Sequence, residues 1–129
     1  MTAARGQTYN VGMPGDLLGY DSDLLRGNTD SMLLFLIQEH GESYGYRLIR
    51  DIQDRSRGFF RFKEGTVYPA LRKLENEGLI QGAWKRLESG QERRYYRITA
   101  RGRESLRKKL AMWQNFNAAM GLIFSPSGG

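Results

Sequence analysis

The stretch of sequence at residues 64–75, EGTVYPALRKLE, decides the fold. Its apolar residues recur at spacings of four and three and so share one face of a helix: Val67, Leu71 and Leu74. Pro69 belongs in or near the first turn of a helix, which predicts a helix from about Gly65 to Glu77. The opposite face carries small, hydroxylated and basic side chains, and these gather at the leading end of the helix.

Two more helices are predicted before this one. The apolar residues from Leu24 through His40 predict a largely buried helix that stops at Gly41, with Gly27 as a weak point inside it. Ser43 is a suitable N-cap for a second helix, which ends near Gly58. The apolar stripe of that second helix consists of Leu48, Ile49 and Ile52.

A hairpin and a long helix are predicted after it. Residues 79–87 and 93–99 are rich in aromatic and branched side chains, and a turn-forming stretch separates them. Thr99 then caps a helix over about residues 100–124, roughly 36 Å long, which is longer than the preceding three-helix unit could cover. Its far half therefore needs another partner. Its apolar residues recur at spacings of four and three, and Asn117 occupies one position of this stripe as its polar member. The apolar members are Leu106, Leu110, Trp113, Met120 and Phe124.

Composition excludes several classes of protein. The 129 residues fit one domain with an arm or tail. With no cysteine and one histidine, disulfide scaffolds, thiolate catalysis and cysteine-based zinc sites are excluded, and no metal or cofactor is expected. No P-loop, G-x-S-x-G or H-E-x-x-H motif occurs, so an enzyme is not expected. The longest apolar run has six residues, whereas a membrane helix needs about 20, so we expect a soluble cytoplasmic protein that does not bind membranes.

Positive charge is concentrated in the second half of the chain. The formal net charge of the whole chain is +6 at pH 7. Residues 1–30 carry a net charge of −2, whereas residues 79–102 carry six basic and two acidic residues, and residues 103–129 carry four basic and one acidic residue. This asymmetry favours a polyanionic partner such as nucleic acid.

Three helices followed by a hairpin is the order of a winged helix-turn-helix, whose third helix enters the major groove of DNA. We therefore predict an α+β, mainly helical chain: a flexible arm over 1–22, a winged-helix DNA-binding domain over 23–99, a long C-terminal dimerisation helix over 100–124, and a tail over 125–129. Side chains suited to phosphate or base-edge contacts are Thr66, Tyr68, Arg72, Lys73, Arg93 and Arg94.

The region from about Leu24 to Phe124 resembles the PadR-type transcriptional regulators, especially their short-tailed branch. The matching segments are Leu25–Thr29, Gly45–Ile49, Glu64–Glu75, Glu77–Ile80, Trp84, and Arg93–Thr99 with Gly102. The resemblance implies a homodimeric repressor, released by a small molecule or a stress signal, and such a symmetric dimer binds a pseudo-palindromic operator in double-stranded DNA. It also adds to the predicted DNA-binding residues: Tyr46, Arg47, Gly65 and Pro69.

The tip of the hairpin departs from the family pattern. Regulators of this kind usually have Gly-Arg-Pro there, whereas this chain has Gly90-Gln91-Glu92, which lacks the arginine and adds a carboxylate. An alternative function therefore stays open. In that alternative, the chain is a dimeric winged-helix module that binds a protein or sequesters a ligand and binds DNA weakly.

Trp113 has two interpretations. In a multidrug-sensing member of the family, a tryptophan at the matching place stacks planar drugs at the dimer interface. Two indole faces across a two-fold axis form a flat apolar slot, which Met112, Phe116 and Met120 could line, so a planar aromatic small molecule is a candidate ligand. The other interpretation is plain packing of the dimer. Its predicted interface consists of Leu106, Leu110, Trp113, Asn117, Met120 and Phe124.

Overall fold

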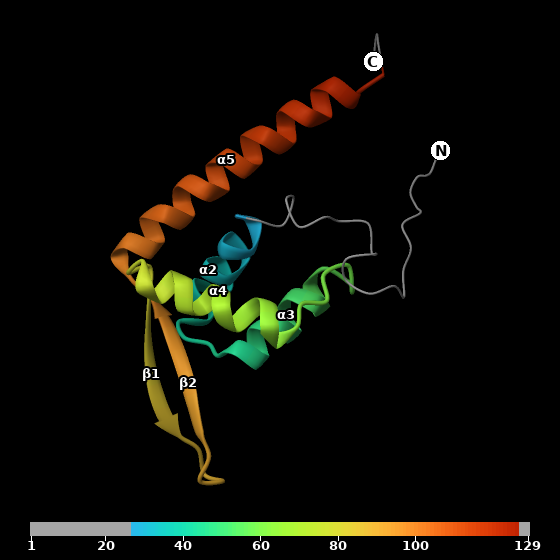
Figure 1. The fold of residues 1–129 in the computed structure, drawn as a ribbon. Helices are drawn as coiled ribbons and strands as arrows, with labels where there is room; N and C mark the ends of the chain where they lie inside the picture. Colours follow the sequence, from blue (N-terminus) through green and yellow to red (C-terminus); the bar gives the residue numbers. More distant parts are fainter. Residues whose placement is uncertain (1–26, 127–129) are drawn as a thin grey trace.

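The computed structural model describes residues 27–126, so the predicted arm over residues 1–22 lies outside the described part. The elements are α2 (Asn28–His40), α3 (Gly45–Arg55), α4 (Glu64–Asn76), β1 (Ile80–Arg86), β2 (Glu92–Ile98) and α5 (Ala100–Phe124). Figure 1 shows three helices packed as one body, from which the β1–β2 hairpin and α5 project in roughly opposite directions. The predicted α+β, mainly helical architecture with a winged helix-turn-helix and a long C-terminal helix is confirmed.

The starts of α2 and α3 differ from the prediction. Gly27 has φ of 87°, a left-handed conformation that a right-handed helix cannot continue, so α2 begins at Asn28 and Gly27 occupies the N-cap position. The predicted N-cap at Ser43 is wrong, because α3 begins one residue later and its N-cap is Tyr44. Ser43 is fully buried and pairs with β2, exchanging two backbone hydrogen bonds of 3.1 and 2.8 Å with Tyr96.

The core lies between the three helices, the base of the hairpin and the root of α5. The predicted apolar stripe of α4 is confirmed, since all three of its residues have no exposed surface. Burying a leucine or isoleucine side chain contributes about 1.5–3 kcal/mol to stability. The fully buried large side chains are Leu33, Leu34, Ile37, Leu48, Val67, Leu71, Leu74, Ile80 and Leu106.

The two strands of the hairpin, called the wing below, are antiparallel. Ile80 lies opposite Ile98 and Lys85 lies opposite Arg93 in this register. Side chains alternate between the two faces of a strand. One face of the wing therefore carries Lys85, Arg93, Tyr95 and Arg97, and the other carries Gly82, Trp84, Arg94 and Tyr96.

The root of α5 is fixed by a cap and a close backbone approach. The Thr99 hydroxyl accepts a hydrogen bond from the Gly102 amide at 3.0 Å and donates one to the Gly78 carbonyl at 2.7 Å, so the predicted cap is confirmed. Gly102 is buried, and a Cβ there would collide with the Leu79 carbonyl oxygen and lie 2.7 Å from Ile98 Cγ1. Only glycine allows the first turn of α5 to approach the wing this closely.

Gly102→Ala is therefore expected to lower the free energy of unfolding by about 2–3 kcal/mol, because the new methyl group overpacks a rigid backbone contact. Gly121→Ala in the same helix is the matched control, since a Cβ there meets nothing within 4 Å, and helix propensity raises stability by up to about 1 kcal/mol. Urea unfolding measures both variants. Equal stabilities would contradict the close approach.

The outer part of α5 leaves the body of the protomer. Leu106 is only 1% exposed and packs in its own core, so the prediction that Leu106 lies at a dimer interface is wrong. Leu110 is partly buried against the same core, and from Ala111 onward nearly every side chain of α5 is exposed. Between residues 27 and 126, no helix has the length and apolar character needed to cross a membrane.

Candidate nucleic-acid interface

The leading end of α4 presents the predicted small and hydroxylated residues. The buried stripe turns the opposite side of the helix outward, so Gly65, Thr66 and Pro69 are exposed. The N-cap residue Lys63 makes no side-chain hydrogen bond to the first turn of α4. The α4 end therefore offers short polar groups and helix N–H groups that no side chain caps.

The Tyr68 ring packs against a glycine of the neighbouring helix, where no side chain blocks it. The ring lies over Gly45 in the first turn of α3, where a Cβ would be 2.7 Å from the ring carbon Cζ. Tyr68 remains 38% exposed, and the exposed Tyr46 follows Gly45 in the chain. Burial raises the pKa of Tyr68 above its usual value, so its phenol stays protonated and can donate a hydrogen bond.

The two adjacent bases of α4 have different surroundings. Lys73 Nζ lies 2.8 Å from Asp30 Oδ2 and 3.4 Å from Glu77 Oε2, so its charge already has two partners. The hydrogen bond with Asp30 is the first cause that raises the pKa of Lys73. Arg72 is exposed, and no ion pair holds it within the described residues. Arg72 is therefore the cation of α4 that is available to a partner.

A cluster of cations and aromatic rings joins the wing to the start of α3. The Arg93 guanidinium lies 4.0 Å from the centre of the Tyr44 ring and donates a 3.4 Å hydrogen bond to the Tyr95 hydroxyl. The Arg47 guanidinium lies 5.3 Å from the centre of the same Tyr44 ring and donates hydrogen bonds to Ser43 Oγ and to the Glu42 carbonyl. Both guanidinium groups donate their hydrogen bonds to neutral acceptors, although the Glu42 carboxylate lies near enough to Arg47 to interact with its charge.

Arg94, predicted together with Arg93 to contact phosphate, lies on the opposite face of the wing from Arg93. Neighbouring residues of a strand point to opposite faces, and Arg94 points to the face that packs on α4. There its Nη2 lies 2.6 Å from Glu75 Oε2, and both side chains are about 30% exposed, at 30% and 29%. The sequence could have indicated this placement, because alternate residues of a strand share one face and Arg94 therefore lies on the same face as the buried residues Tyr96 and Ile98.

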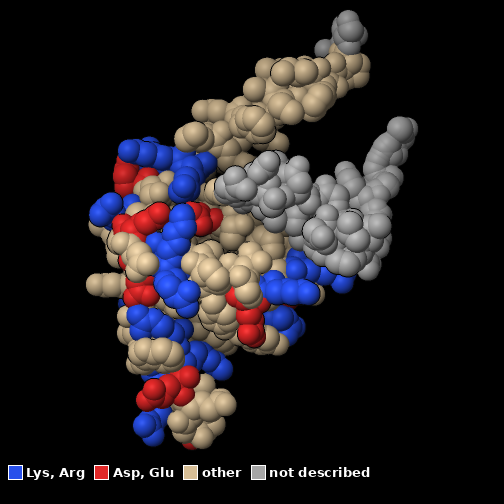
Figure 2. All heavy atoms as spheres, in the orientation of Figure 1, with Lys and Arg blue, Asp and Glu red and all other residues tan. Residues whose placement is uncertain are grey.

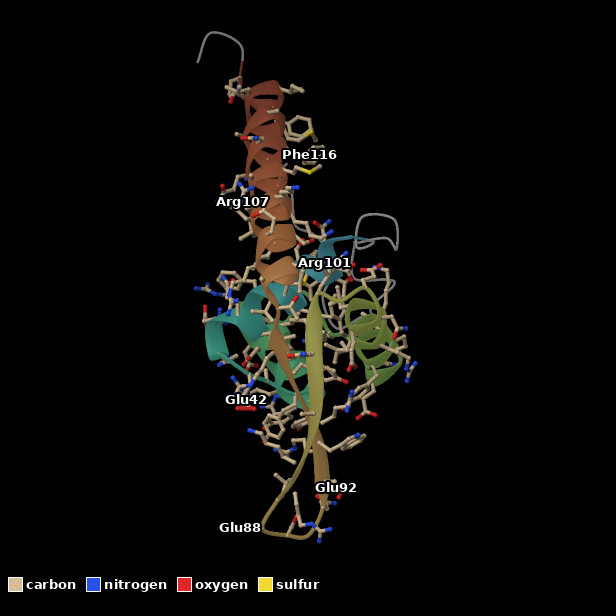
Figure 3. All side chains as sticks on the ribbon, turned by 90° about the vertical axis from the view of Figure 1, so that its left-hand side faces the viewer. Glu42, Glu88, Glu92, Arg101, Arg107 and Phe116 are labelled. Atoms are coloured by element: carbon tan, nitrogen blue, oxygen red, sulfur yellow. The ribbon has the colours of Figure 1, made fainter. Side chains whose placement is uncertain are left out.

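Sequence reasoning also missed a carboxylate between α2 and α3. Glu42 Oε2 lies 2.6 Å from Lys85 Nζ, and its Oε1 lies 3.4 Å from Arg97 Nη2. The hydrogen bond from Lys85 holds the pKa of Glu42 below its usual value. Figure 3 shows Glu42 beside the wing, with Glu88 and Glu92 at the tip.

Charge and apolar surface are segregated along the molecule. Figure 2 shows basic and acidic side chains interspersed over the wing and the body, whereas the outer length of α5 carries neither. Residues 110–126 contain no charged residue. Trp113 and Phe116 are 52% and 63% exposed there, and Met112 and Phe124 are also exposed. No group of three or more acidic or histidine side chains that could hold a metal ion occurs within residues 27–126.

The family model of the PadR-like transcriptional regulators matches residues 33–108. The chain belongs to this family. It is similar to a transcriptional regulator from Clostridium thermocellum, with a TM-score of 0.73 and 30% identity, over 82% of this chain and 99% of that one. It is 36% identical over 92 residues to an uncharacterized protein from Lysinibacillus sphaericus, which covers 71% of this chain and 84% of that protein.

A Mycobacterium tuberculosis transcriptional regulator is 43% identical over 54 residues, 42% of this chain and 50% of that protein. PadR-like regulators bind DNA and are typically dimeric. The predicted family is therefore confirmed, and this PadR-like chain is a transcriptional regulator.

Proposed function

We propose that this PadR-like regulator is a ligand-responsive repressor that binds a pseudo-palindromic operator as a homodimer. The observation that carries the proposal is the exposed side of α4, where Thr66, Tyr68 and Arg72 face outward and Arg72 has no ion pair within residues 27–126. Such side chains can contact base edges and phosphates in the major groove. Two copies in a symmetric dimer bind half-sites about 34–36 Å apart, or a multiple of that spacing.

The remaining predicted DNA-binding residues support different parts of this contact. Gly65 and Pro69 allow close approach of α4, and Tyr46 follows Gly45, against which the Tyr68 ring packs, at the start of α3. Arg47 and Arg93 keep their positive charge between α3 and the wing, where a phosphate strand can reach them. In this proposal Lys73 and Arg94 stabilise the interface and do not bind DNA directly, because carboxylates already pair with them.

The outer half of α5 supports the homodimer. Leu106 is buried at the root of the helix, and the same apolar stripe continues outward past the body of the protomer. The exposed part of the stripe is uncharged, as expected for a surface that a second copy of the helix covers. The proposed interface consists of Leu110, Trp113, Asn117, Met120 and Phe124.

A mobility-shift titration with the chain's own upstream DNA tests the repressor proposal. The dimer is expected to bind a pseudo-palindrome there at least about 1,000-fold more tightly than unrelated DNA of the same length. Affinity for the two DNAs within tenfold of each other would instead favour the second candidate, a protein-binding or ligand-sequestering module with weak DNA binding. The tip of the wing favours that candidate, because Glu88 and Glu92 are exposed there; Glu88 repels phosphates, while the charge of Glu92 is partly offset by Arg86, whose Nη2 lies 3.8 Å from Glu92 Oε2.

The ligand proposal places a planar aromatic molecule against Trp113 and its partner copy, with Met112, Phe116 and Met120 as the lining. In a Trp84→Phe background, which removes the second emitter, a planar aromatic cation is expected to quench Trp113 fluorescence saturably at micromolar concentration. Trp113→Ala in the same background should weaken its binding at least about tenfold by calorimetry. Unchanged binding would remove Trp113 from the site.

A further inference from the structure

The wing is held to the helical body on both of its faces. Glu42 contacts the face that carries Lys85 and Arg97, and Glu75 contacts the opposite face through Arg94. Figure 3 shows the wing extending well beyond the body. Arg97 lies near the base of the wing, whereas Arg94 and Lys85 lie further along it, so the contacts hold both the base and the outer part of the paired strands. A pair of attachments on opposite faces resists rotation of the wing in either direction.

Glu75 contacts both strands of the wing. Glu75 Oε2 accepts a hydrogen bond from Arg94 Nη2 at 2.6 Å and a second one from the Gly82 amide at 3.3 Å. The Arg94 guanidinium lies across Gly82, where a Cβ would be only 2.8 Å from it. The Trp84 and Tyr96 rings flank it, with centres 5.5 and 5.8 Å away. Glycine at this position therefore opens the path by which Arg94 reaches α4.

The contact with Glu42 is supported by the backbone beside it. Glu42 binds Lys85 and Arg97, while its own carbonyl accepts from Arg47 at the start of α3. The next residue, Ser43, is paired with Tyr96 of β2 by two backbone hydrogen bonds. Glu42 thus lies next to the single β-bridge, between Ser43 and Tyr96, that joins the segment before α3 to the wing.

We infer that Glu42 and Glu75 are positioning residues that fix the angle between the wing and α4 and so determine how well the dimer discriminates its operator from other DNA. The inference rests on the proposed function. Glu75 lies in the last turn of α4, and Arg72 lies one turn before it, so the contact ties the wing to the helix that carries the base-reading residues. The two carboxylates also neutralise three wing cations, which lowers the attraction to phosphates of any sequence.

The test compares Glu42→Gln and Glu75→Gln with Glu77→Gln. Glu77 is the matched control because it lies beside α4 at the same end and its ion pair, with Lys73, does not involve the wing. The first readout is amide exchange in the protein without DNA. Exchange at Ser43 and Tyr96 is expected to become about tenfold faster in the two test variants, because release of one face of the wing promotes opening of the bridge.

The second readout is the ratio of affinities for the operator and for random DNA. In the test variants the ratio is expected to fall about tenfold, with tighter binding to random DNA and a steeper salt dependence as cations are freed. The reversed pair, Glu75→Arg with Arg94→Glu, should recover part of the lost ratio, which simple loss of charge would not do. Glu77→Gln should match the wild type in both readouts.

The outcomes separate the inference from the function on which it rests. Amide exchange and affinity ratios like those of the wild type would overturn the inference. Faster exchange with an unchanged ratio would overturn it too, since the carboxylates would then hold the wing without affecting DNA discrimination. A wild-type dimer that does not discriminate its operator would overturn the proposed function, while amide exchange alone would still decide whether the carboxylates hold the wing. Thermal melts of every variant confirm that each is folded.

Discussion

Two glutamates in the proposed interface on α5, introduced as Trp113→Glu and Phe124→Glu, are expected to convert the proposed dimer into monomers. Both side chains are exposed in the protomer, so the substitutions leave its own core intact. A dimer interface would bury the new carboxylates without partners, which is strongly unfavourable. Sedimentation should show an increase of at least about 100-fold in the dimer dissociation constant, equivalent to about 2.8 kcal/mol.

The operator affinity should fall with the dimer. A monomer binds one half-site without the high effective concentration that the second half-site provides, so a loss of about 100-fold to 10,000-fold is expected. Asn115→Glu with Ala118→Glu is the matched control, because these residues lie on the opposite side of α5 and add the same charge. Dissociation of the control variant to the same extent would contradict the assigned face.

Arg72→Ala is expected to have the second largest effect, a loss of about 10- to 100-fold in operator affinity. Arg72 is exposed and unpaired within the described residues, so it can bind a guanine edge or a phosphate at little cost. A dimer loses two such contacts. Lys73→Ala should cost no more than about threefold, because Asp30 and Glu77 already hold that ammonium group.

Salt titrations distinguish the two bases further. Arg72→Ala should lower the slope of log affinity against log salt concentration by about one for each subunit, whereas Lys73→Ala should leave it nearly unchanged. Circular dichroism checks that both variants are folded. Equal losses for the two variants would contradict the roles that their ion pairs indicate.

The order and type of the elements could be predicted from the sequence, because each long element has a strong local pattern. The apolar rhythm and the Thr99 cap predicted a last helix over residues 100–124, and α5 has these bounds. The strands lie within one residue of their predicted limits. Pro69 correctly restricted the start of α4, which begins one residue before the predicted Gly65. The family followed from segments that carry glycines and aromatic residues at fixed spacing.

The partners of individual charges could not be predicted in this way. Lys73 binds Asp30 and Lys85 binds Glu42, and each pair is separated by 43 residues in the chain. Only tertiary packing brings such groups together. Leu106 was misassigned for the same reason, since one stripe of α5 is first covered by its own protomer and then leaves it. Periodicity identifies an apolar face but not the chain that covers it.

The charge-free outer half of α5 means that added salt should affect the proposed association of two subunits and the binding of DNA differently. Association through apolar side chains gains from added electrolyte or ignores it, whereas attachment to a duplex weakens steeply as released counterions lose their entropic advantage. High salt is therefore expected to release the nucleic acid from the proposed dimer while its two subunits stay associated.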